Sequence, residues 1–294
     1  MYELDITDYP EVRPLFAELA DYQIMARGTL HGARPGQIYV DDPTHPQSAF
    51  LCARVRHFLA GNPTNRAFNQ ALADFIASPE FIHDPNRSHP DRLILDCHPA
   101  EWREQFAMLF GALLPAEISR RHYRFRQFPW DWRTRLPAGF IARPIDQDLL
   151  ANDQLKNIQG VRRWAHLNWN QAGGVCLQRG DEIASWCLPV AISGNACELG
   201  IETVPFYRQQ GLGALATMAT VDWCLERGLT VIGWHCDASN RASWSVAEKS
   251  GFVLERNYTH YLRFFDLAAH YAASGESRRQ EENYPAALPR IASG

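Results

Sequence analysis

The sequence predicts a mixed α/β protein built from two parts that run in similar order. Of its 294 residues 46% are hydrophobic and 21% are charged, which supplies a core and excludes a disordered tail protein. Segments with apolar residues at helical spacing alternate with strand-like runs. A connector rich in Pro and Trp interrupts this alternation at 129–139, and the alternation then begins again.

The first part, residues 1–128, reads as a smaller α/β domain. Apolar residues at helical spacing predict helices over Val12–Arg27, Asn65–Ile76 and Ala100–Leu113. Apolar or alternating runs predict strands at Gln37–Val40, Ala49–Val55, Arg92–Asp96 and Arg121–Phe128.

The second part, residues 140–273, repeats this kind of pattern. Helices are expected from about 148 to 169, over Leu212–Arg227 and over Arg241–Ser250. Strands are expected at Phe140–Arg143, Val175–Gln178, Ile183–Ile192, Cys197–Thr203, Thr230–His235, Phe252–Tyr258 and His260–Phe265. Residues 274–294 are polar and are expected to form a frayed tail. The similar order of the two parts suggests a degenerate internal duplication.

Composition narrows the class of partner. The net charge of −4 argues against binding to nucleic acid or a membrane surface, and no apolar run approaches the roughly 20 residues of a bilayer span. The segment 120–126 is basic and aromatic, but it alternates as any half-buried strand does. The first residues lack the pattern of a signal peptide, so we expect a cytoplasmic protein. Seven cysteines without a CxxC pair, and histidines without ligand spacing, predict no metal.

The most informative segment is Glu198–Ala214, a strand that enters a tight turn and then an amphipathic helix. Glycines at 211 and 213 allow positive φ and a close backbone approach. Such a turn aims N–H groups outward at a helix N-terminus, where the helix dipole favours anions. A pyrophosphate fits there without a lysine. The spacing differs from that of a P-loop and of a dinucleotide-binding fold.

Two motifs in this region carry a family resemblance. Arg208–Gly213 (RQQGLG) resembles the Arg/Gln-x-x-Gly-x-Gly/Ala acyl-CoA signature of the GNAT acyltransferase superfamily. Asn240–Phe252 resembles that superfamily's Asn-x-x-Ser/Ala and Glu-Lys-x-Gly-Phe segment. The string WHCDASN at 234–240 and the additional N-terminal part resemble a two-domain bacterial subfamily.

The resemblance implies a GNAT-type mixed central sheet flanked by helices and an N-acetyltransferase with acetyl-CoA as co-substrate and no metal. Backbone groups of Thr203 and Val204 would bind the pantetheine and polarise the thioester. The amides of 209–214 would hold the pyrophosphate, and Asn240 would contact the CoA arm. The implied cofactor-binding residues are Thr203, Val204, Arg208, Gln209, Gln210, Gly211, Leu212, Gly213, Ala214 and Asn240.

The general base and acid are less sharply defined. Glu198 and Glu202 lie four apart on one expected strand, so both face one side, and either can act as the base or be an ordinary strand residue. Many relatives carry a Tyr acid seven residues after the Asn, where this chain has Ala247. Ser243 is therefore the candidate acid. An inactive acyl-CoA sensor is an alternative that Ala247 motivates.

The resemblance implies that the acceptor is a primary amine of a small molecule or of a peptide N-terminus. Trp164, His166 and Trp169 fall where this fold places its acceptor-lining helices, although packing beneath the hairpin is the commoner reason for large aromatic residues. The first part lacks the glycine turn, because 61–68 has no second glycine. It should cover the acceptor or form a homodimer surface, and an interaction scaffold is a further alternative.

Overall fold

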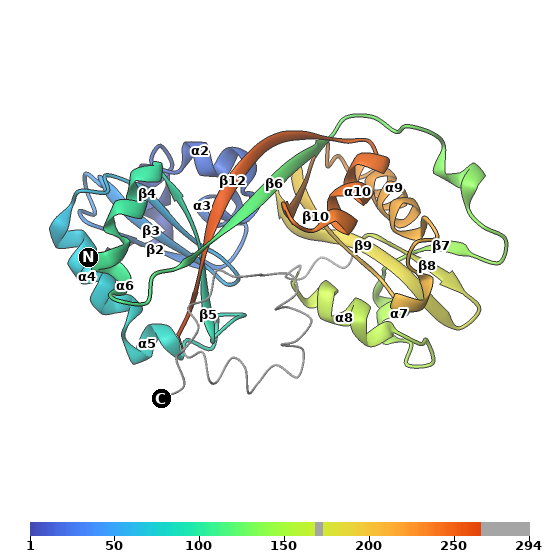
Figure 1. The fold of residues 1–294 in the computed structure, drawn as a ribbon, viewed down its shortest axis with the longest axis horizontal. Coiled ribbons are helices and arrows are strands. Elements are labelled where there is room, and N and C mark those ends of the chain that lie inside the picture. The colour runs from blue at the N-terminus through green and yellow to red at the C-terminus, as the bar shows by residue number, and fades with distance from the viewer. Residues whose placement is uncertain (168–172, 266–294) are drawn as a thin grey trace. The chain divides into compact units, whose positions relative to one another are not determined.

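The computed structural model describes residues 1–167 and 173–265 (Figure 1). The chain forms two compact units. Unit 1 consists of Met1–Ser119 together with the segment that begins at Thr259, and unit 2 consists of Arg120–Tyr258. The chain therefore passes from unit 1 into unit 2 and returns to unit 1 after Tyr258.

The sheet of unit 1 contains one parallel pair of strands. Its strands follow in the order β1 (Tyr2–Glu3), β2 (Gly36–Val40), β3 (Ser48–Ala53), β4 (His57–Gly61), β5 (Arg92–His98) and the last part of β12 (Phe252–Phe264). Neighbours are antiparallel except β4 and β5. A parallel pair needs a crossover connection, which contains helix α4 (Arg66–Ile76).

The helices of unit 1 are α1 (Tyr9–Val12), α2 (Ala17–Tyr22), α3 (Ile24–Leu30), α4, α5 (Pro79–Ile82) and α6 (Phe106–Phe110), with 3-10 turns at Ile6–Asp8 and Ala100–Gln105. Helices α4, α5 and α6 contribute to a core rich in aromatic side chains. Helix α4 begins where the Asn65 side chain accepts the Phe68 N–H. Its Phe68, Leu72 and Ile76 share one buried face, and each such side chain contributes about 1.5–3 kcal/mol by its burial.

The sheet of unit 2 also has one parallel pair. Its strands follow in the order β12, β6 (Ala116–Phe125), β11 (Val231–Asp237), β10 (Ala196–Thr203), β9 (Glu182–Ser193), β8 (Val175–Arg179) and β7 (Ile141–Pro144). Strands β10 and β11 are parallel, and helix α9 (Leu212–Leu225) connects them. The hairpin β8–β9 and the antiparallel pair β9–β10 precede this crossover.

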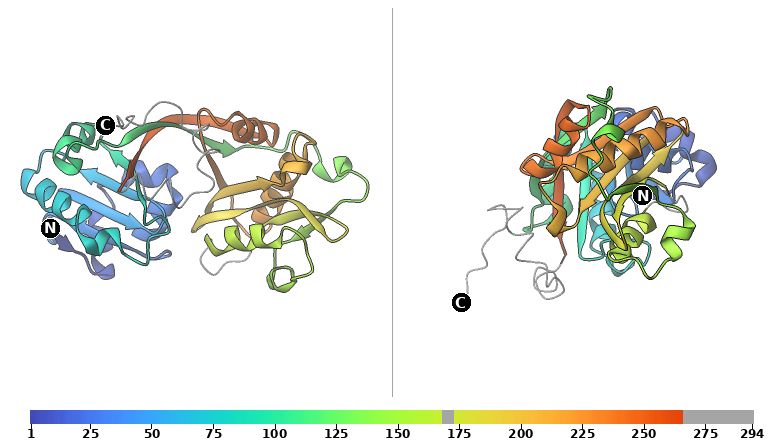
Figure 2. Two further views of the ribbon diagram at one scale, coloured as in Figure 1. Left: turned by 60° about the horizontal axis from the view of Figure 1, so that its bottom comes forward. Right: turned by 90° about the vertical axis from the view of Figure 1, so that its right-hand side faces the viewer.

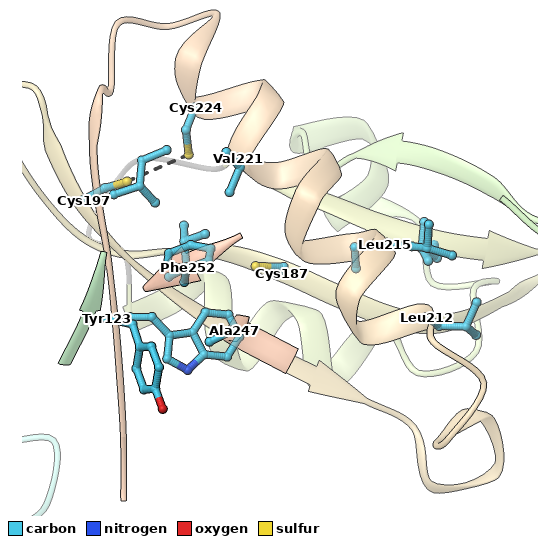
Figure 3. Close-up of a cluster of buried hydrophobic side chains, with 14 of the residues drawn as sticks. Tyr123, Cys187, Cys197, Leu212, Leu215, Val221, Cys224, Ala247 and Phe252 are labelled. Carbon is cyan, nitrogen blue, oxygen red and sulfur yellow. Dashed lines mark hydrogen bonds between the residues drawn. The ribbon is translucent and has the colours of Figure 1, made fainter. Parts of the chain in front are cut away.

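Helices cover both faces of this sheet (Figure 2). Helices α9 and α10 (Arg241–Lys249) pack on one face over a core that contains Leu212, Leu215 and Val221 (Figure 3). The sulfur atoms of Cys197 and Cys224 lie 3.9 Å apart in this core. Helices α7 (Gln147–Ala151) and α8 (Ile158–Leu167) pack through a separate apolar cluster. The predicted α/β class, with a mixed sheet flanked by helices, is confirmed.

Both units share an order of elements: an antiparallel pair of strands, a crossover helix and a parallel strand. In unit 1 these are β3, β4, α4 and β5, and in unit 2 they are β9, β10, α9 and β11. This common order agrees with the predicted duplication.

The strand that closes each part of the sequence pairs with the other part. Tyr123 of β6, the last strand of the first part, pairs with Trp234 of β11 in unit 2. Tyr261 of β12, the last strand of the second part, pairs with Leu95 of β5 in unit 1. The compact units consequently divide at Ser119/Arg120 and Tyr258/Thr259, whereas the sequence pattern places its connector at 129–139. Each dividing point lies inside a strand, so no turn residue marks it.

Several elements of the structure differ from those expected. Strand β4 was not predicted, because the turn before it, closed by the Ala53 N–H donating to the Arg56 carbonyl oxygen, contains no Gly, Pro, Asn or Asp. The helix expected over Val12–Arg27 breaks at Gln23, whose buried side chain donates to Asp96 at 3.5 Å. The two closing strands are one strand, β12.

Candidate functional site

The two central strands of unit 2 separate partway along their length. Strands β10 and β11 pair from Ala196 with Val231 to Leu199 with Trp234. Beyond this point β10 pairs only with β9 among the described strands, and its register on β9 shifts between Glu198 and Leu199. The shift leaves Val190 of β9 without a partner on β10, and such a bulge bends the pair locally. The edge of β10 over 200–203 is unpaired on its β11 side, and we call this unpaired stretch the gap.

The backbone of Thr203 turns toward that gap. The Val204 N–H donates to the Ala184 carbonyl oxygen at 2.9 Å, and the Glu202 carbonyl oxygen accepts from the Ser185 hydroxyl. Successive N–H groups of a strand point to opposite edges, so the Thr203 N–H lies on the edge away from β9. Of the two backbone groups implied by the resemblance, the N–H of Val204 is thus already engaged, and that of Thr203 faces the gap.

Five consecutive backbone N–H groups follow, those of 209–213, and none has a protein acceptor in the described part of the chain. Gln209 has φ 63° and Gly211 has φ 80°, which turns these amides in a left-handed bend before α9. The Ala214 N–H is outside this group, because it donates to the Gly211 carbonyl oxygen at 3.1 Å. We call the N–H groups of 209–213 the amide nest.

The amide nest begins at exposed residues and ends where the chain enters the core. Arg208, Gln209, Gln210 and Gly211 are exposed, while Leu212 is buried in the core. A Cβ atom at Gly211 would meet no atom within 4 Å. Five donors without a protein acceptor in the described part of the chain, at the N-terminus of a 14-residue helix, form a site suited to a multiply charged anion.

The corresponding loop of unit 1 is closed by its own side chains. The Asn62 side chain accepts the Thr64 N–H at 2.9 Å, and the Asn65 side chain accepts the Phe68 N–H at 3.1 Å. These two oxygens take up donors that would otherwise face an anion. The loop of unit 1 therefore lacks the second glycine, and two of its N–H groups are bound by its own side chains.

Glu198 lies among polar side chains on the sheet face opposite α9. Its side chain is 8% exposed, and its Oε1 lies 3.6 Å from Nε2 of His235 on β11. The other ring nitrogen of His235, Nδ1, lies 2.9 Å from the hydroxyl of Tyr258. Glu198 lies one residue before Leu199, where the pairing of β10 with β11 ends. These polar surroundings suit a proton acceptor.

Glu202 lies on the same face of β10, as the four-residue spacing predicts. Its Oε2 accepts a hydrogen bond from Nε1 of Trp164 on α8 at 2.7 Å. Glu202 is therefore held against α8, and Glu198 against β11.

Ser243 and Asn240 meet at the start of α10. The Asn240 side-chain oxygen accepts the Ser243 N–H at 3.0 Å and so caps the helix. The Ser243 hydroxyl accepts from Nε1 of buried Trp234 at 3.1 Å. One turn later, Val246 lies 3.4 Å from the position of a Cβ at Gly213, which ties α10 to the start of α9.

A family model described as GNAT acetyltransferase matches residues 13–261. The chain belongs to the GNAT acetyltransferase family. This match covers most of both parts, so the family resemblance of Arg208–Gly213 and Asn240–Phe252 is confirmed. The family also gives the class of enzyme, an acyltransferase.

Individual relatives of this GNAT protein agree with the match. An uncharacterized N-acetyltransferase of Bacillus subtilis (strain 168), YdfB, is 26% identical over 235 residues, which cover 77% of this chain and 85% of that protein. A GCN5-related N-acetyltransferase-like protein from Streptococcus suis 89/1591 is 21% identical and covers 87% of this chain and 98% of its own, with a TM-score of 0.61. A tandem GNAT protein from the clavulanic acid biosynthesis pathway is 14% identical and covers 88% and 95%, with a TM-score of 0.56. The two solved structures share the fold.

Of the three aromatic acceptor candidates in this GNAT protein, the structure places one side chain. Trp164 lies on α8, donates to Glu202 and packs over Gly200. The backbone of His166 belongs to α8, but its side chain and the whole of Trp169 lie outside the described residues.

Gly200→Ala should displace Trp164, because a Cβ there would lie 2.1 Å from the Trp164 ring. Crowding of this kind typically costs about 1–3 kcal/mol. We expect a lower unfolding temperature and a changed KM for the acceptor. Gly213→Ala is the control, since its Cβ would meet its neighbours at an ordinary 3.4 Å. Equal unfolding temperatures for the two variants would contradict the close approach of α8 to β10.

Ala247, where many GNAT relatives carry a tyrosine, is fully buried in the core cluster with α9. Its methyl group places no proton donor at the gap. On α10 the Ser243 hydroxyl faces the sheet, where it accepts from Nε1 of Trp234 on β11.

The sequence did not predict the polar side chains around Glu198 and His235, which include Tyr258, Arg120, Asp237 and His122. The spacing of two between His235 and Asp237, which puts both on one strand face, was the available signal. Tyr258, Arg120 and His122 come from β12 and β6, whose places beside β11 no local pattern shows.

No group of three or more His, Cys, Asp or Glu side chains suited to a metal ion occurs among the described residues. Within the same residues, no helix is long and apolar enough to cross a membrane.

Proposed function

We propose that the protein transfers an acetyl group from acetyl-CoA to a primary amine, of a small molecule or of a peptide N-terminus, by direct attack of the amine. The amide nest beside the gap between β10 and β11 is the observation that carries this proposal. It supplies donors for the diphosphate, and the gap supplies an edge of backbone for the pantetheine arm. The residues present therefore fit acetyl-CoA.

The amide nest binds the diphosphate through backbone N–H groups, and the exposed side chain of Arg208 adds a positive charge next to it. The Nε of Arg208 donates to the Thr203 carbonyl oxygen at 3.0 Å, which holds the guanidinium at the entrance to the gap. Asn240, whose oxygen caps α10, keeps its amide N–H₂ for the CoA arm.

The Thr203 N–H donates to the thioester oxygen, where negative charge develops as the amine attacks. Donors fixed at a developing oxyanion are usually the largest contribution to catalysis of acyl transfer. Binding of both reactants at the gap also converts a bimolecular reaction into an effectively unimolecular one.

Glu198 accepts the proton that the attacking amine must lose, either directly or through a water. Its place beside His235 at the end of the paired part of β10 supports this role over Glu202, which is bound to Trp164. The leaving group is the CoA thiolate, to which the Ser243 hydroxyl donates a proton while it takes another from water.

Ser243→Ala should lower kcat about 10-fold and leave the Kd of acetyl-CoA unchanged. The effect is modest because a thiol of pKa near 8.5 is a good leaving group even without an acid. The change also leaves the buried Trp234 N–H without its acceptor, at a cost of about 1–3 kcal/mol in stability. Ser243→Thr, which keeps the hydroxyl, is the control. A kcat for Ser243→Ala equal to wild type would assign the proton to water.

Unit 1 is proposed to bind no acetyl-CoA, because Asn62 and Asn65 occupy the amides of its loop. Its predicted role is to cover the acceptor or to form a dimer surface. Calorimetry should then give one acetyl-CoA per chain, and two sites would contradict this assignment.

The proposed function is tested by spectroscopic detection of free thiol from acetyl-CoA with a panel of primary amines and peptides. Amine-dependent release of thiol supports it. Binding of acetyl-CoA without release of thiol for any amine would favour the inactive sensor that Ala247 motivates. No binding at all would favour an interaction scaffold.

A further inference from the structure

A chain of polar side chains runs from Glu198 through unit 2. Glu198 on β10 faces His235 on β11, His235 faces Tyr258 on β12, and Tyr258 accepts from Nε of Arg120 on β6 at 3.4 Å. Arg120 forms an ion pair with Asp237, two residues after His235. Strands that are distant in sequence thus place a polar group beside each ring nitrogen of the histidine.

The hydrogen bonds around Tyr258 fit one tautomer of His235. Arginine only donates, so the Tyr258 oxygen accepts from Arg120, and the Tyr258 proton can be donated to Nδ1 of His235, 2.9 Å away. With Nδ1 accepting, the ring proton of neutral His235 lies on Nε2. This is the nitrogen that faces Glu198.

The geometry points to His235 as a positioning residue for acetyl transfer: its Nε2–H holds the Glu198 carboxylate in the orientation and charge state in which Glu198 takes the proton of the acceptor amine. This inference rests on the proposed function. The separation of 3.6 Å exceeds a hydrogen bond, but contacts at catalytic groups commonly shorten in the substrate complex.

The neighbours His122, Arg120 and Arg124 are either neutral or paired with other carboxylates. His122 stacks on His235 with ring centroids 4.6 Å apart, and its burial, together with the neighbouring His235, lowers the pKa of His122 to about 3, so it adds no charge. Arg120 is paired with Asp237, and Arg124 with Glu255. The titratable and charged groups around this histidine pair are Glu198 on β10, Arg120 and Arg124 on β6, Tyr258, Glu255 and Arg256 on β12, and Asp237 on β11.

The matched variants are His235→Asn and His235→Gln in the full chain. An Asn amide replaces the Nδ1 side of the ring and loses the donor toward Glu198, whereas a Gln amide reaches the Nε2 position and keeps it. A donor to a carboxylate favours its charged form, so its loss makes the carboxylate protonate at higher pH. The acid limb of kcat/KM against pH should therefore move up by about one pH unit in His235→Asn, with kcat about 10-fold lower. In His235→Gln the limb should stay near wild type.

Tyr258→Phe provides a second route to the same result. This change removes the hydroxyl that hydrogen-bonds Nδ1 of His235, so the ring is no longer held in one tautomer, and it leaves Glu198 itself unchanged. The acid limb should therefore move in the same direction by a smaller amount. Calorimetric binding of acetyl-CoA, which depends on the amide nest, should stay within about threefold of wild type in every variant and reports that unit 2 is folded.

The inference is overturned if wild type releases thiol and both His235→Asn and Tyr258→Phe, folded by this criterion, keep its kcat and its acid limb. It is also overturned if His235→Gln moves the limb as far as His235→Asn. A wild-type protein that binds acetyl-CoA and releases no thiol with any amine overturns the proposed function, and this inference with it. If His235→Asn does not fold, Tyr258→Phe and His235→Gln decide.

Discussion

Gly211→Asp should weaken acetyl-CoA binding by about 100-fold. The substitution adds a carboxylate to the middle of the amide nest, where the site has donors for an anion and Gly211 has open space. Two like charges about 4 Å apart near a protein surface repel by about 4 kcal/mol, and screening at an exposed loop leaves roughly two-thirds of it. Isothermal titration of acetyl-CoA into the variant measures the change in Kd.

Gly211→Asn is the matched control. Asn and Asp have the same shape and tolerate the positive φ of residue 211 better than other side chains, so the pair differs mainly in charge. Gly211→Asn should lose less than about 10-fold in affinity. If both variants bind acetyl-CoA as wild type does, the diphosphate lies elsewhere and the glycine turn has a structural role only.

Glu198→Gln should lower kcat by about 100- to 1,000-fold, because a positioned general base typically contributes between 10²- and 10⁴-fold. The amide cannot take the proton of the attacking amine. Acetyl-CoA binding should change by less than about threefold, since Glu198 lies beside His235 on the sheet face opposite α9, whose N-terminus carries the amide nest. Steady-state kinetics with an amine acceptor and titration of acetyl-CoA measure the two quantities.

Glu202→Gln is the control for the base, on the same strand and the same face. The Gln oxygen can still accept the hydrogen bond from Trp164, so the local structure is kept and kcat should fall by less than about 10-fold. A larger fall in kcat for Glu202→Gln than for Glu198→Gln would transfer the role of base to Glu202.

The amide nest could be predicted from the sequence because its causes are local. Glycine at 211 permits the left-handed bend, and the apolar run from Leu212 anchors α9 immediately after it. The identity of the family followed from the spacing of two such local motifs. The spacing of Glu198 and Glu202 likewise predicted a common strand face, which the contacts with His235 and Trp164 show.

The rest depends on pairings between distant strands. Strands β6 and β12 bring Arg120 and Tyr258 beside His235, although the three residues are far apart in the chain. Residues within one strand give no sign of which strand will be their neighbour. For the same reason the unit boundaries fall inside β6 and β12, and the Pro- and Trp-rich connector does not mark them.

The central claim is that the amide nest and the adjoining gap bind acetyl-CoA through its diphosphate. The most direct test is isothermal titration of the wild-type protein with acetyl-CoA and, in parallel, with S-acetylpantetheine, which has the thioester arm but no diphosphate. We expect a Kd near 1 μM for acetyl-CoA, about −8 kcal/mol, and binding at least about 100-fold weaker for S-acetylpantetheine. No binding of acetyl-CoA, or equal binding of the two compounds, would contradict the claim.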